Sequence, residues 1–529
     1  MGRHRTRQRA LALILGAALA VTSCSGGDGD AAEREPGRDE GPSTTEGPGP
    51  VAEALPALER LHVARAGGRA HIADGQGREV LLRGANLNVL GDYHQADPTL
   101  PPVLPATDAD WDQMAAHGFS VVRLLVSWSA LEPVRGQLDQ AYLQRIRDAV
   151  AAAAARRIHT VIDMHQDAWG RFIASPPDVA CGPGTEPAIG WDGAPQWATL
   201  TDGADTCRPI GSREGAPAVR AAFTAFYENR DGIRDAFVAT WRRLAAAFAT
   251  EPAVAGFDLF NEPTMVFDAA VAEQRYTELT SALVTAIRAG EAEAGGFPHI
   301  VFLEPIVLFP VPGTVPAPGF TTDDQIAFAP HNYAESIGPA LLTVEQTMDV
   351  AVGTATERGW ALWIGEHGVF ETTEEKLDVL HRFAAAQDGA LAGGAQWQWR
   401  QRCGDPHAIG VPGTRPTATQ VQLNDVACPD DIDAGPNREL LRVAGRAYPR
   451  AAPGRLTELV SDPRAGTLRV AGALADDLGD WGPLVLWVPG QEAPRVEADG
   501  TAEPEATRVP GGWLLTAEVT DSPWEVRVS

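Results

Sequence analysis

The chain has 529 residues, enough for one domain of barrel size and a smaller second domain. It contains 70 acidic and 43 basic residues, and its formal net charge at pH 7 is −27. Because binding to a phosphate backbone requires clustered Lys and Arg, this charge argues against a nucleic-acid partner. We interpret the acidity as a solvated surface that keeps the protein soluble.

The first 24 residues have the layout of an export signal. Four arginines within residues 3–9 form a basic segment, and the apolar residues 11–21 are too few to span a bilayer. The sequence Val21-Thr22-Ser23-Cys24 resembles the bacterial lipoprotein lipobox, in which the cysteine is lipidated and becomes the mature N-terminus. We therefore expect an exported protein that lipid on Cys24 holds at the cell membrane. The alternative is an ordinary cleaved signal peptide, with Cys24 incidental and the protein secreted.

Residues 25–54 consist of Gly, Pro, acidic residues, Ser and Thr, with almost no large apolar side chains. A segment of this composition cannot bury enough apolar surface to fold. We expect it to be a disordered acidic tether that separates the following domain from the membrane.

From residue 55 to residue 450, strand-like apolar runs alternate with stretches of helical periodicity. The spacing of Leu143, Ile146 and Val150 is helical, for example. Eight runs have the character of strands: residues 80–86, 120–125, 160–165, 255–261, 300–304, 326–331, 361–366 and 394–399. Eight strands with helical crossovers predict an α/β fold, a (β/α)8 TIM barrel whose active site lies at the carboxyl ends of the strands.

Beyond residue 455 the pattern changes to short strands separated by turn residues, without helical stretches between them. This predicts a small C-terminal antiparallel β-sandwich over residues 455–529. Its tryptophans fall mostly within the strand patterns, which favours packing against the barrel over an exposed sugar-binding platform.

Export gives the remaining four cysteines a structural meaning. They form two local pairs, and we expect the disulfides Cys181–Cys207 and Cys403–Cys428, each worth about 3 kcal/mol through restriction of the unfolded chain. The sequence contains no C-x-x-C pair and no matching His spacing, so we expect no zinc site. No phosphate loop or dinucleotide fingerprint is present, so we expect no cofactor.

Two of the predicted strands end in a glutamate. One run places Asn261-Glu262 before Pro263, and the other places Glu366 before His367 and Gly368. An apolar run that ends in this way is typical of a buried parallel strand that delivers one polar residue to the rim of a barrel. Two carboxylates on one rim are the minimum requirement for glycoside hydrolysis.

Further polar and aromatic residues lie in or directly after the other predicted strands: Arg123, His165, His331, Tyr333 and Trp397. Together with the two glutamates, they occur along the chain in the order of the motifs of glycoside hydrolase family 5. The chain therefore resembles this family over about residues 57–450. The resemblance implies that Glu262 is the acid/base and Glu366 the nucleophile of a retaining reaction. In such enzymes the two carboxyl groups lie about 5–5.5 Å apart.

The retaining mechanism requires opposite protonation states of the two glutamates. Glu366 must be ionised, and we expect Arg123 and Tyr333 to donate hydrogen bonds that keep it so. Glu262 must be protonated at the start, and we expect the anionic Glu366 to raise its pKa.

The same resemblance implies a set of sugar-binding residues. We expect Asn261 to bond the sugar 2-hydroxyl, and His165 and His331 to bind hydroxyls or orient the carboxylates. Trp397 offers a ring face as a sugar platform, with Trp399 as the alternative.

The segment Asp163-Met164-His165-Gln166-Asp167 is similar to the endoglycoceramidase branch of the family. Those enzymes cut the β-linkage between glycan and ceramide in glycosphingolipids, and they pair the barrel with a C-terminal sandwich. Asp167 is then expected to bind a sugar; alternatively, Asp163 and Asp167 tie neighbouring loops to arginines. We cannot match loop 168–215 to the family feature by feature, and its aromatic residues either line a lipid groove or form the core of a lid. His367 also stands where the family more usually has an aromatic residue.

Other substrates fit the same barrel motifs. An endo-β-glucanase, a mannanase and a β-glucosidase acting on steryl or other lipid glucosides are alternatives within the family. A lipoprotein that binds carbohydrate without cutting it is the alternative from another class, and the presence of both glutamates argues against it. We expect a monomer.

Overall fold

The computed structural model describes residues 50–529 except 96–98, 100, 308, 338–340, 408–420 and 475–480. The export segment, Cys24 and most of the predicted tether lie outside the described residues. The end of that tether is helical, because Val51–Ala54 forms α1 and Val51 is buried. Within the described part of the chain, none of the helices combines the length and apolarity that crossing a bilayer would require.

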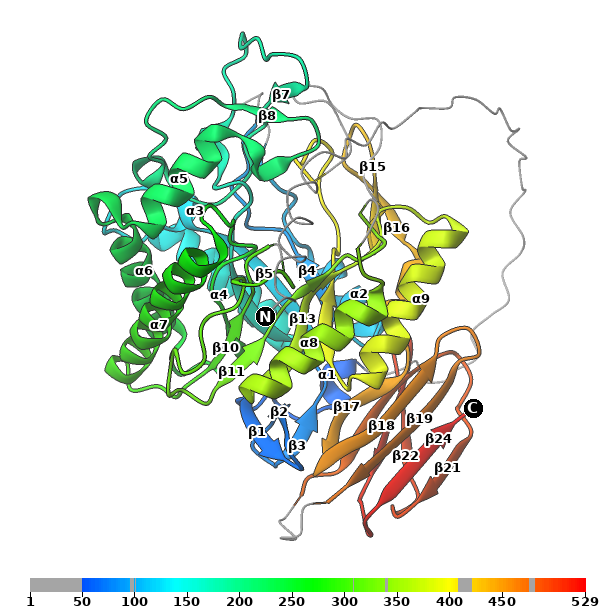
Figure 1. Ribbon diagram of the computed structural model, residues 1–529. Helices are drawn as coiled ribbons and strands as arrows, with labels where there is room; N and C mark the ends of the chain where they lie inside the picture. The colour runs from blue at the N-terminus through cyan, green and yellow to red at the C-terminus, as the bar shows by residue number, and fades with distance from the viewer. Residues whose placement is uncertain are drawn as a thin grey trace, which may run out of the picture.

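All eight predicted barrel strands are present and pair in parallel around a closed ring (Figure 1). Strand β14 pairs with β4, and β11 pairs with β13, which completes the closure. The strands are β4 (Arg83–Leu87), β5 (Val121–Ser127), β6 (His159–His165), β9 (Val254–Asp258), β10 (Ile300–Leu303), β11 (Ile326–Phe328), β13 (Ala361–His367) and β14 (Gly393–Gln396). The two-residue β12 (His331–Asn332) pairs with the end of β13.

The helices cover the outside of the barrel with their apolar faces inward. Leu143, Ile146 and Val150 are buried, as their spacing predicts, and Asp139 caps the first turn of their helix by accepting from Tyr142 N. The helices are α2 (Asp108–Ala116), α3 (Trp128–Leu131), α4 (Gln140–Ala155), α5 (Pro217–Tyr227), α6 (Ile233–Phe248), α7 (Ala269–Glu293), α8 (Val344–Arg358), α9 (Glu374–Gly389) and α10 (Arg438–Ala444).

The C-terminal region forms two antiparallel sheets. One contains β18 (Arg455–Asp462), β19 (Thr467–Ala473), β24 (Trp524–Val528) and β21 (Val496–Asp499). The other contains β17 (Tyr448–Pro453), β20 (Leu484–Pro489), β23 (Gly512–Ala517) and β22 (Glu505–Val509), extended by β1 (His62–Ala66), β2 (Arg69–Ala73) and β3 (Arg78–Val80).

The second sheet therefore takes three strands from the segment before the barrel. Val80 lies opposite Ala451 in the pairing of β3 with β17, so hydrogen bonds cross the boundary that the sequence places at residues 450–455. The predicted strand 80–86 is accordingly split, with β3 in the sandwich and β4 in the barrel. β1–β3 lie below the barrel in Figure 1, at the end opposite the hairpin of β7 (Thr185–Pro187) and β8 (Cys207–Pro209).

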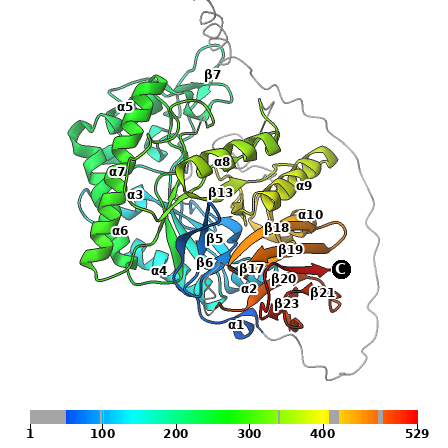
Figure 2. The same ribbon diagram turned by 60° about the horizontal axis from the view of Figure 1, so that its bottom comes forward.

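The sandwich is packed against the barrel (Figure 2). Tyr448 donates from its hydroxyl to Gly118 O at 2.8 Å, and the buried Trp487 donates from Nε1 to Gly445 O at 2.9 Å. A Cβ on Gly118 would lie 2.3 Å from the Trp487 ring, so this contact requires a glycine. Trp487 and Trp524 are buried, which fits a packing role, whereas Trp481 and Trp513 are partly exposed.

Both predicted disulfides are present, with Cα–Cα distances of 5.6 Å for Cys181–Cys207 and 5.5 Å for Cys403–Cys428. The first disulfide closes a loop within the segment that follows β6. The second joins the loop after β14 to the end of β15 (Asn424–Ala427), which pairs with β16 (Ile432–Pro436). Both loops contribute residues to the carboxyl-terminal face of the barrel, described next.

Candidate active site

The two glutamates predicted from the strand ends meet at the carboxyl-terminal face of the barrel. Glu366 lies near the end of β13, whereas β9 ends at Asp258 and Glu262 follows in a loop. Oxygens of the two carboxylates lie within 4.8 Å of one another. This proximity fits the short spacing of the two carboxyl groups in a retaining glycosidase.

The backbone at Glu262 is held in a strained conformation. Its φ is +38°, a value that residues other than glycine rarely adopt. The Glu262 amide donates to Glu304 Oε2 at 2.9 Å, and Gln166 Nε2 donates to the carbonyls of Asn261 and Glu262 at 2.6 and 3.0 Å. These bonds fix the direction of the Glu262 side chain.

Arg123 on β5 organises the floor of the site. It is fully buried and donates from Nη1 to Glu366 Oε1 at 2.7 Å and from Nη2 to Asn261 Oδ1 at 2.9 Å. It also pairs with Asp163, Asp258 and Glu304 at 3.0, 2.8 and 2.6 Å. Burial acts to lower the pKa of Arg123, but these carboxylates raise it well above its usual value.

Glu366 receives the two predicted donors. In addition to the bond from Arg123, Tyr333 donates from its hydroxyl to Oε2 at 2.9 Å. His331 Nδ1 lies 3.5 Å from the same oxygen. Burial nevertheless raises the pKa of Glu366 above its usual value, against the opposing charges of His331 and Arg123.

Glu262 has different partners, and the expected rise of its pKa is wrong. His331 Nδ1 lies 2.8 Å from its Oε1, and Arg213 Nη2 pairs with its Oε2. Burial acts to raise the pKa of Glu262, but Arg213 and His331 outweigh it and lower the pKa to about 2. The sequence-based prediction considered only the repulsion from Glu366.

Arg213 and Glu304 are two residues of the site that the sequence analysis did not single out. Arg213 belongs to a short turn after the Cys181–Cys207 disulfide, and nothing in its local sequence indicates its position. Glu304 ends the fifth predicted strand, and this apolar run ending in a carboxylate was a usable signal. Its Oε1 accepts from Arg123, and its Oε2 accepts from the Glu262 amide and lies 3.2 Å from His331 Nε2.

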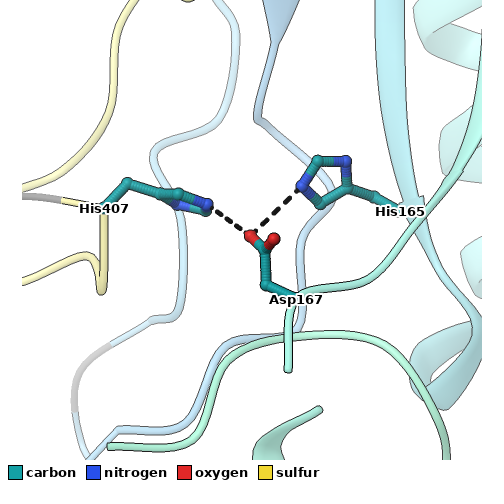
Figure 3. A group of neighbouring side chains, drawn as sticks. All are labelled: His165, Asp167 and His407. Atoms are coloured by element: carbon teal, nitrogen blue, oxygen red, sulfur yellow. Dashed lines mark hydrogen bonds and ion pairs between the residues drawn. The ribbon is translucent and has the colours of Figure 1, made fainter. Parts of the chain in front are cut away.

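A second group of residues lies beside the glutamates, and we call it the His165–Asp167–His407 cluster. Figure 3 shows Asp167 between the two imidazole rings. Asp167 Oδ2 lies 2.6 Å from His407 Nε2 and 3.5 Å from His165 Nε2. The opposite ring nitrogens are held by carboxylates, His165 Nδ1 by Asp163 at 2.7 Å and His407 Nδ1 by Asp405 at 2.7 Å.

The cluster is joined to the catalytic pair through Arg213, which pairs with Asp167 as well as with Glu262. His407 was not identified from the sequence, because it lies in the loop closed by the Cys403–Cys428 disulfide and reaches the cluster only in the fold. Burial acts to lower the pKa of His407, but Asp405 and Asp167 raise it to about 9.

Three groups of side chains in the described part of the chain have the spacing of metal ligands: the cluster; Glu262, His331 and Glu366; and Asp163, Asp258 and Glu304. In each group a guanidinium already neutralises at least one carboxylate. Arg213 pairs with Asp167 and Glu262, and Arg123 pairs with the third group. We assign no metal role to them.

Trp397, rather than Trp399, faces the site. The Trp397 ring stacks on His165 with a centroid distance of 5.7 Å and lies 4.9 Å from the ring of His407. Trp399 is buried and donates from Nε1 to Asp110 Oδ1 at 2.9 Å. His367 turns away from the site and stacks on Phe383 at 4.0 Å.

The loop over residues 168–215 has a buried part and an exposed part. Trp169 is buried and packs against Phe223 and Phe226 at 4.9 and 5.2 Å. Phe172 and Ile210 are 42% and 50% exposed. Trp169 therefore belongs to a packed core. The lipid groove stays a prediction, and it depends on the exposed Phe172 and Ile210.

Comparison with known proteins agrees with this geometry. Residues 73–401 match the family model for cellulase, glycosyl hydrolase family 5. The chain is 32% identical to endoglycoceramidase I of Rhodococcus hoagii (strain 103S) over 286 residues, which are 50% of this chain and 51% of that protein. The chain thus spans about half the length of this curated relative.

Among solved structures, the crystal structure of an endogalactoceramidase superposes with a TM-score of 0.81 and 40% identity, covering 89% of this chain and 100% of that one. Endo-glycoceramidase II from Rhodococcus sp. superposes with a TM-score of 0.68 and 24% identity, covering 87% of this chain and 99% of that one. The second likeness concerns the fold alone.

Proposed function

The chain belongs to glycosyl hydrolase family 5, and on this premise we propose that it is a retaining β-glycosidase that releases the glycan of a glycosphingolipid. The observation that carries the retaining chemistry is the proximity of Glu262 and Glu366, since one oxygen of each carboxylate lies within 4.8 Å of the other. The glycolipid substrate is supported by the likeness to an endoglycoceramidase and to an endogalactoceramidase.

In the proposed mechanism Glu366 attacks the anomeric carbon while Glu262 gives its proton to the leaving oxygen. This step breaks the bond between sugar and aglycone and forms an ester between the sugar and Glu366. Arg123 and Tyr333 hold the attacking carboxylate in position. Glu262 then takes a proton from water as the water oxygen attacks the anomeric carbon, and Glu366 leaves as a carboxylate.

Arg213 opposes the first step through its pairing with Glu262. Its pairing with Glu262 favours the carboxylate, whereas the mechanism needs the carboxylic acid. We infer that the leaving oxygen takes the place of the guanidinium beside Glu262 when substrate binds. Asp167 Oδ1, which pairs with Arg213, is then open to a sugar hydroxyl, while Oδ2 stays beside His407; the sequence predicts that Asp167 binds a sugar.

The Arg213→Gln variant tests this inference. Without the guanidinium we expect the pKa of Glu262 to rise by about 1–3 units, because burial is then opposed mainly by His331. At and above neutral pH, kcat/KM on a soluble aryl β-glycoside should rise about tenfold for each unit, since more enzyme carries the proton on Glu262. The measurement is the pH profile of kcat/KM.

Arg208→Gln is the matched control, because Arg208 lies in the same loop and pairs with Glu186 instead. Its profile should coincide with that of the wild type. A uniform loss of activity in Arg213→Gln at every pH would contradict the proton-controlling role and indicate a structural one.

The substrate is tested by product analysis on a panel. It contains β-glucosylceramide, β-galactosylceramide, a longer glycosphingolipid, a steryl glucoside and soluble β-glucans, because these represent the alternatives within the family. We expect release of intact glycan and ceramide. Turnover of the soluble glucans or the steryl glucoside alone would reject the ceramide specificity while leaving the retaining chemistry in place.

We also propose that the protein is exported and that lipid on Cys24 anchors it. The basic and apolar segments before Cys24 and the two disulfides of the described domain support this, because disulfides persist in oxidising compartments. Fractionation tests it: a Cys24→Ala variant should no longer sediment with membranes.

A further inference from the structure

Asp192 is a buried carboxylate that the catalytic mechanism does not use. Its side chain is fully enclosed, and within the described part of the chain neither of its oxygens has a hydrogen-bond partner. Burial of a carboxylate without donors is costly, so such a group calls for an explanation.

The position of Asp192 is fixed by the backbone around it. Its carbonyl accepts from the Asp167 amide at 3.1 Å, and the following Gly193 donates to Ser127 Oγ at 3.3 Å. A Cβ on Gly193 would lie 2.6 Å from Trp169 O, so the segment is held close against the loop after β6. Asp192 is therefore a rigid part of the same face as the His165–Asp167–His407 cluster.

Tyr93 is a second buried polar residue without a partner at the same place. Its hydroxyl has no hydrogen-bond partner in the described residues, and its ring lies edge-on to His407 at 5.2 Å. Burial raises the pKa of Tyr93, and Asp192 is the nearby charge that adds most to this rise. His165 Nε2 is buried as well, and among the described residues its polar neighbour is Asp167 Oδ2 at 3.5 Å.

The electrostatic surroundings of Asp192 point to the same location. Burial raises the pKa of Asp192 to about 7, the imidazoles of His165 and His407 act to lower it, and the carboxylates of Asp167 and Asp405 act to raise it. Asp192 thus lies within the influence of the whole cluster. Trp191, directly before it, places its ring 4.8 Å from His407.

We propose that Asp192 and Tyr93 form a binding site for hydroxyl groups of the glycan. The ligand is a neutral sugar: two hydroxyls donate to the carboxylate oxygens, and the Tyr93 hydroxyl bonds a sugar oxygen. A site of this kind determines specificity, because an analogue without the hydroxyl leaves a buried acceptor unpaired. The proposal rests on the proposed function, which supplies the sugar, and adds residues to it that neither the strand-end pattern nor the mechanism identifies.

The test compares the wild type with Asp192→Asn and Tyr93→Phe, and uses Asp178→Asn as the control. Asp178 is an exposed residue of the same loop. On an aryl β-lactoside we expect kcat/KM to fall about 10- to 100-fold in Asp192→Asn, the usual cost of a lost hydrogen bond to a charged group. The Tm of that variant should stay equal to the wild-type value or rise, because an unpaired buried carboxylate has been removed.

Deoxy analogues of the same lactoside identify the hydroxyl. The analogue that lacks the bonded hydroxyl should be a poor substrate for the wild type, and Asp192→Asn should discriminate against it much less. Calorimetric titration of free lactose into each protein provides a readout that does not need turnover. Weaker binding by Asp192→Asn and by Tyr93→Phe, with unchanged binding by Asp178→Asn, is the expected result, even if the lipid specificity proposed above fails.

Two outcomes would overturn the proposal. One is equal lactose affinity and equal kcat/KM in the wild type and Asp192→Asn, which would mean that only water occupies the site. The other is a lower Tm in Asp192→Asn together with an equal loss on every deoxy analogue, which would make Asp192 a structural residue.

Discussion

Replacement of Glu366 by alanine is expected to lower kcat on β-glycosides by about 10⁴-fold or more, because no covalent intermediate can then form. Glu262→Ala should lower kcat on a glycolipid by about 10²–10⁴-fold, the usual contribution of general acid–base catalysis. On a dinitrophenyl β-glycoside the loss in the first step should be small, since that leaving group departs without a proton. A burst of dinitrophenol followed by slow turnover is the signal to measure.

Azide separates the two roles by stereochemistry. In Glu262→Ala, azide should attack the glycosyl-enzyme and give the β-glycosyl azide. In Glu366→Ala, azide fits the space of the missing nucleophile and should give the α-glycosyl azide. The exposed Glu371, five residues beyond Glu366, provides the control Glu371→Ala with wild-type kinetics. The same anomer from both variants would contradict the assignment of acid/base and nucleophile.

The parts of the fold that the sequence predicts correctly are those with a local cause. Each barrel strand is a short apolar run buried on both faces, so all eight could be located without knowledge of their partners. Helical spacing at Leu143, Ile146 and Val150 likewise depends on one segment. The pairing of β3 with β17 joins residues more than 350 positions apart, and neither strand contains a signal for the other.

The same distinction applies to the site. Glu262, Glu366, Arg123, Tyr333 and Trp397 converge because strand ends of a barrel must meet on one face. Arg213 lies in the loop that follows the Cys181–Cys207 disulfide, and His407 lies in the loop closed by Cys403–Cys428. Loop paths are not encoded in a periodic pattern. The expected pKa of Glu262 was wrong for this reason, since its strongest charged partner lies on such a loop.

The electrostatic core beneath the site has a large expected effect on stability. Arg123 is the buried cation that contacts Asp163, Asp258, Glu304 and Glu366 at 3.0 Å or less. Breaking a buried ion pair by removing one partner typically costs about 3–5 kcal/mol, because the other charge is left buried without compensation. We expect Arg123→Met to lower the free energy of unfolding by at least this amount, measured by urea denaturation at pH 8.

The loss in Arg123→Met should depend on pH with a definite sign. Burial and neighbouring carboxylates already raise the pKa of Asp258 well above its usual value, and removal of the guanidinium raises it further. A group with a raised folded pKa destabilises the native state above that pKa and ceases to do so as it takes up a proton. The deficit of Arg123→Met relative to the wild type should therefore shrink between pH 8 and pH 5.

Arg156 is the matched control for this prediction, because its ion pairs with Asp108 and Asp112, both at 3.0 Å, lie at the surface. Exposed pairs of this kind contribute at most about 1 kcal/mol, so Arg156→Met should unfold almost as the wild type does at both pH values. Equal stabilities of the two variants would show that the carboxylates around Arg123 are neutral in the native protein. In that case Glu366 would lack the ionised state that its role as nucleophile requires, so the same measurement bears on the catalytic assignment as well as on the fold.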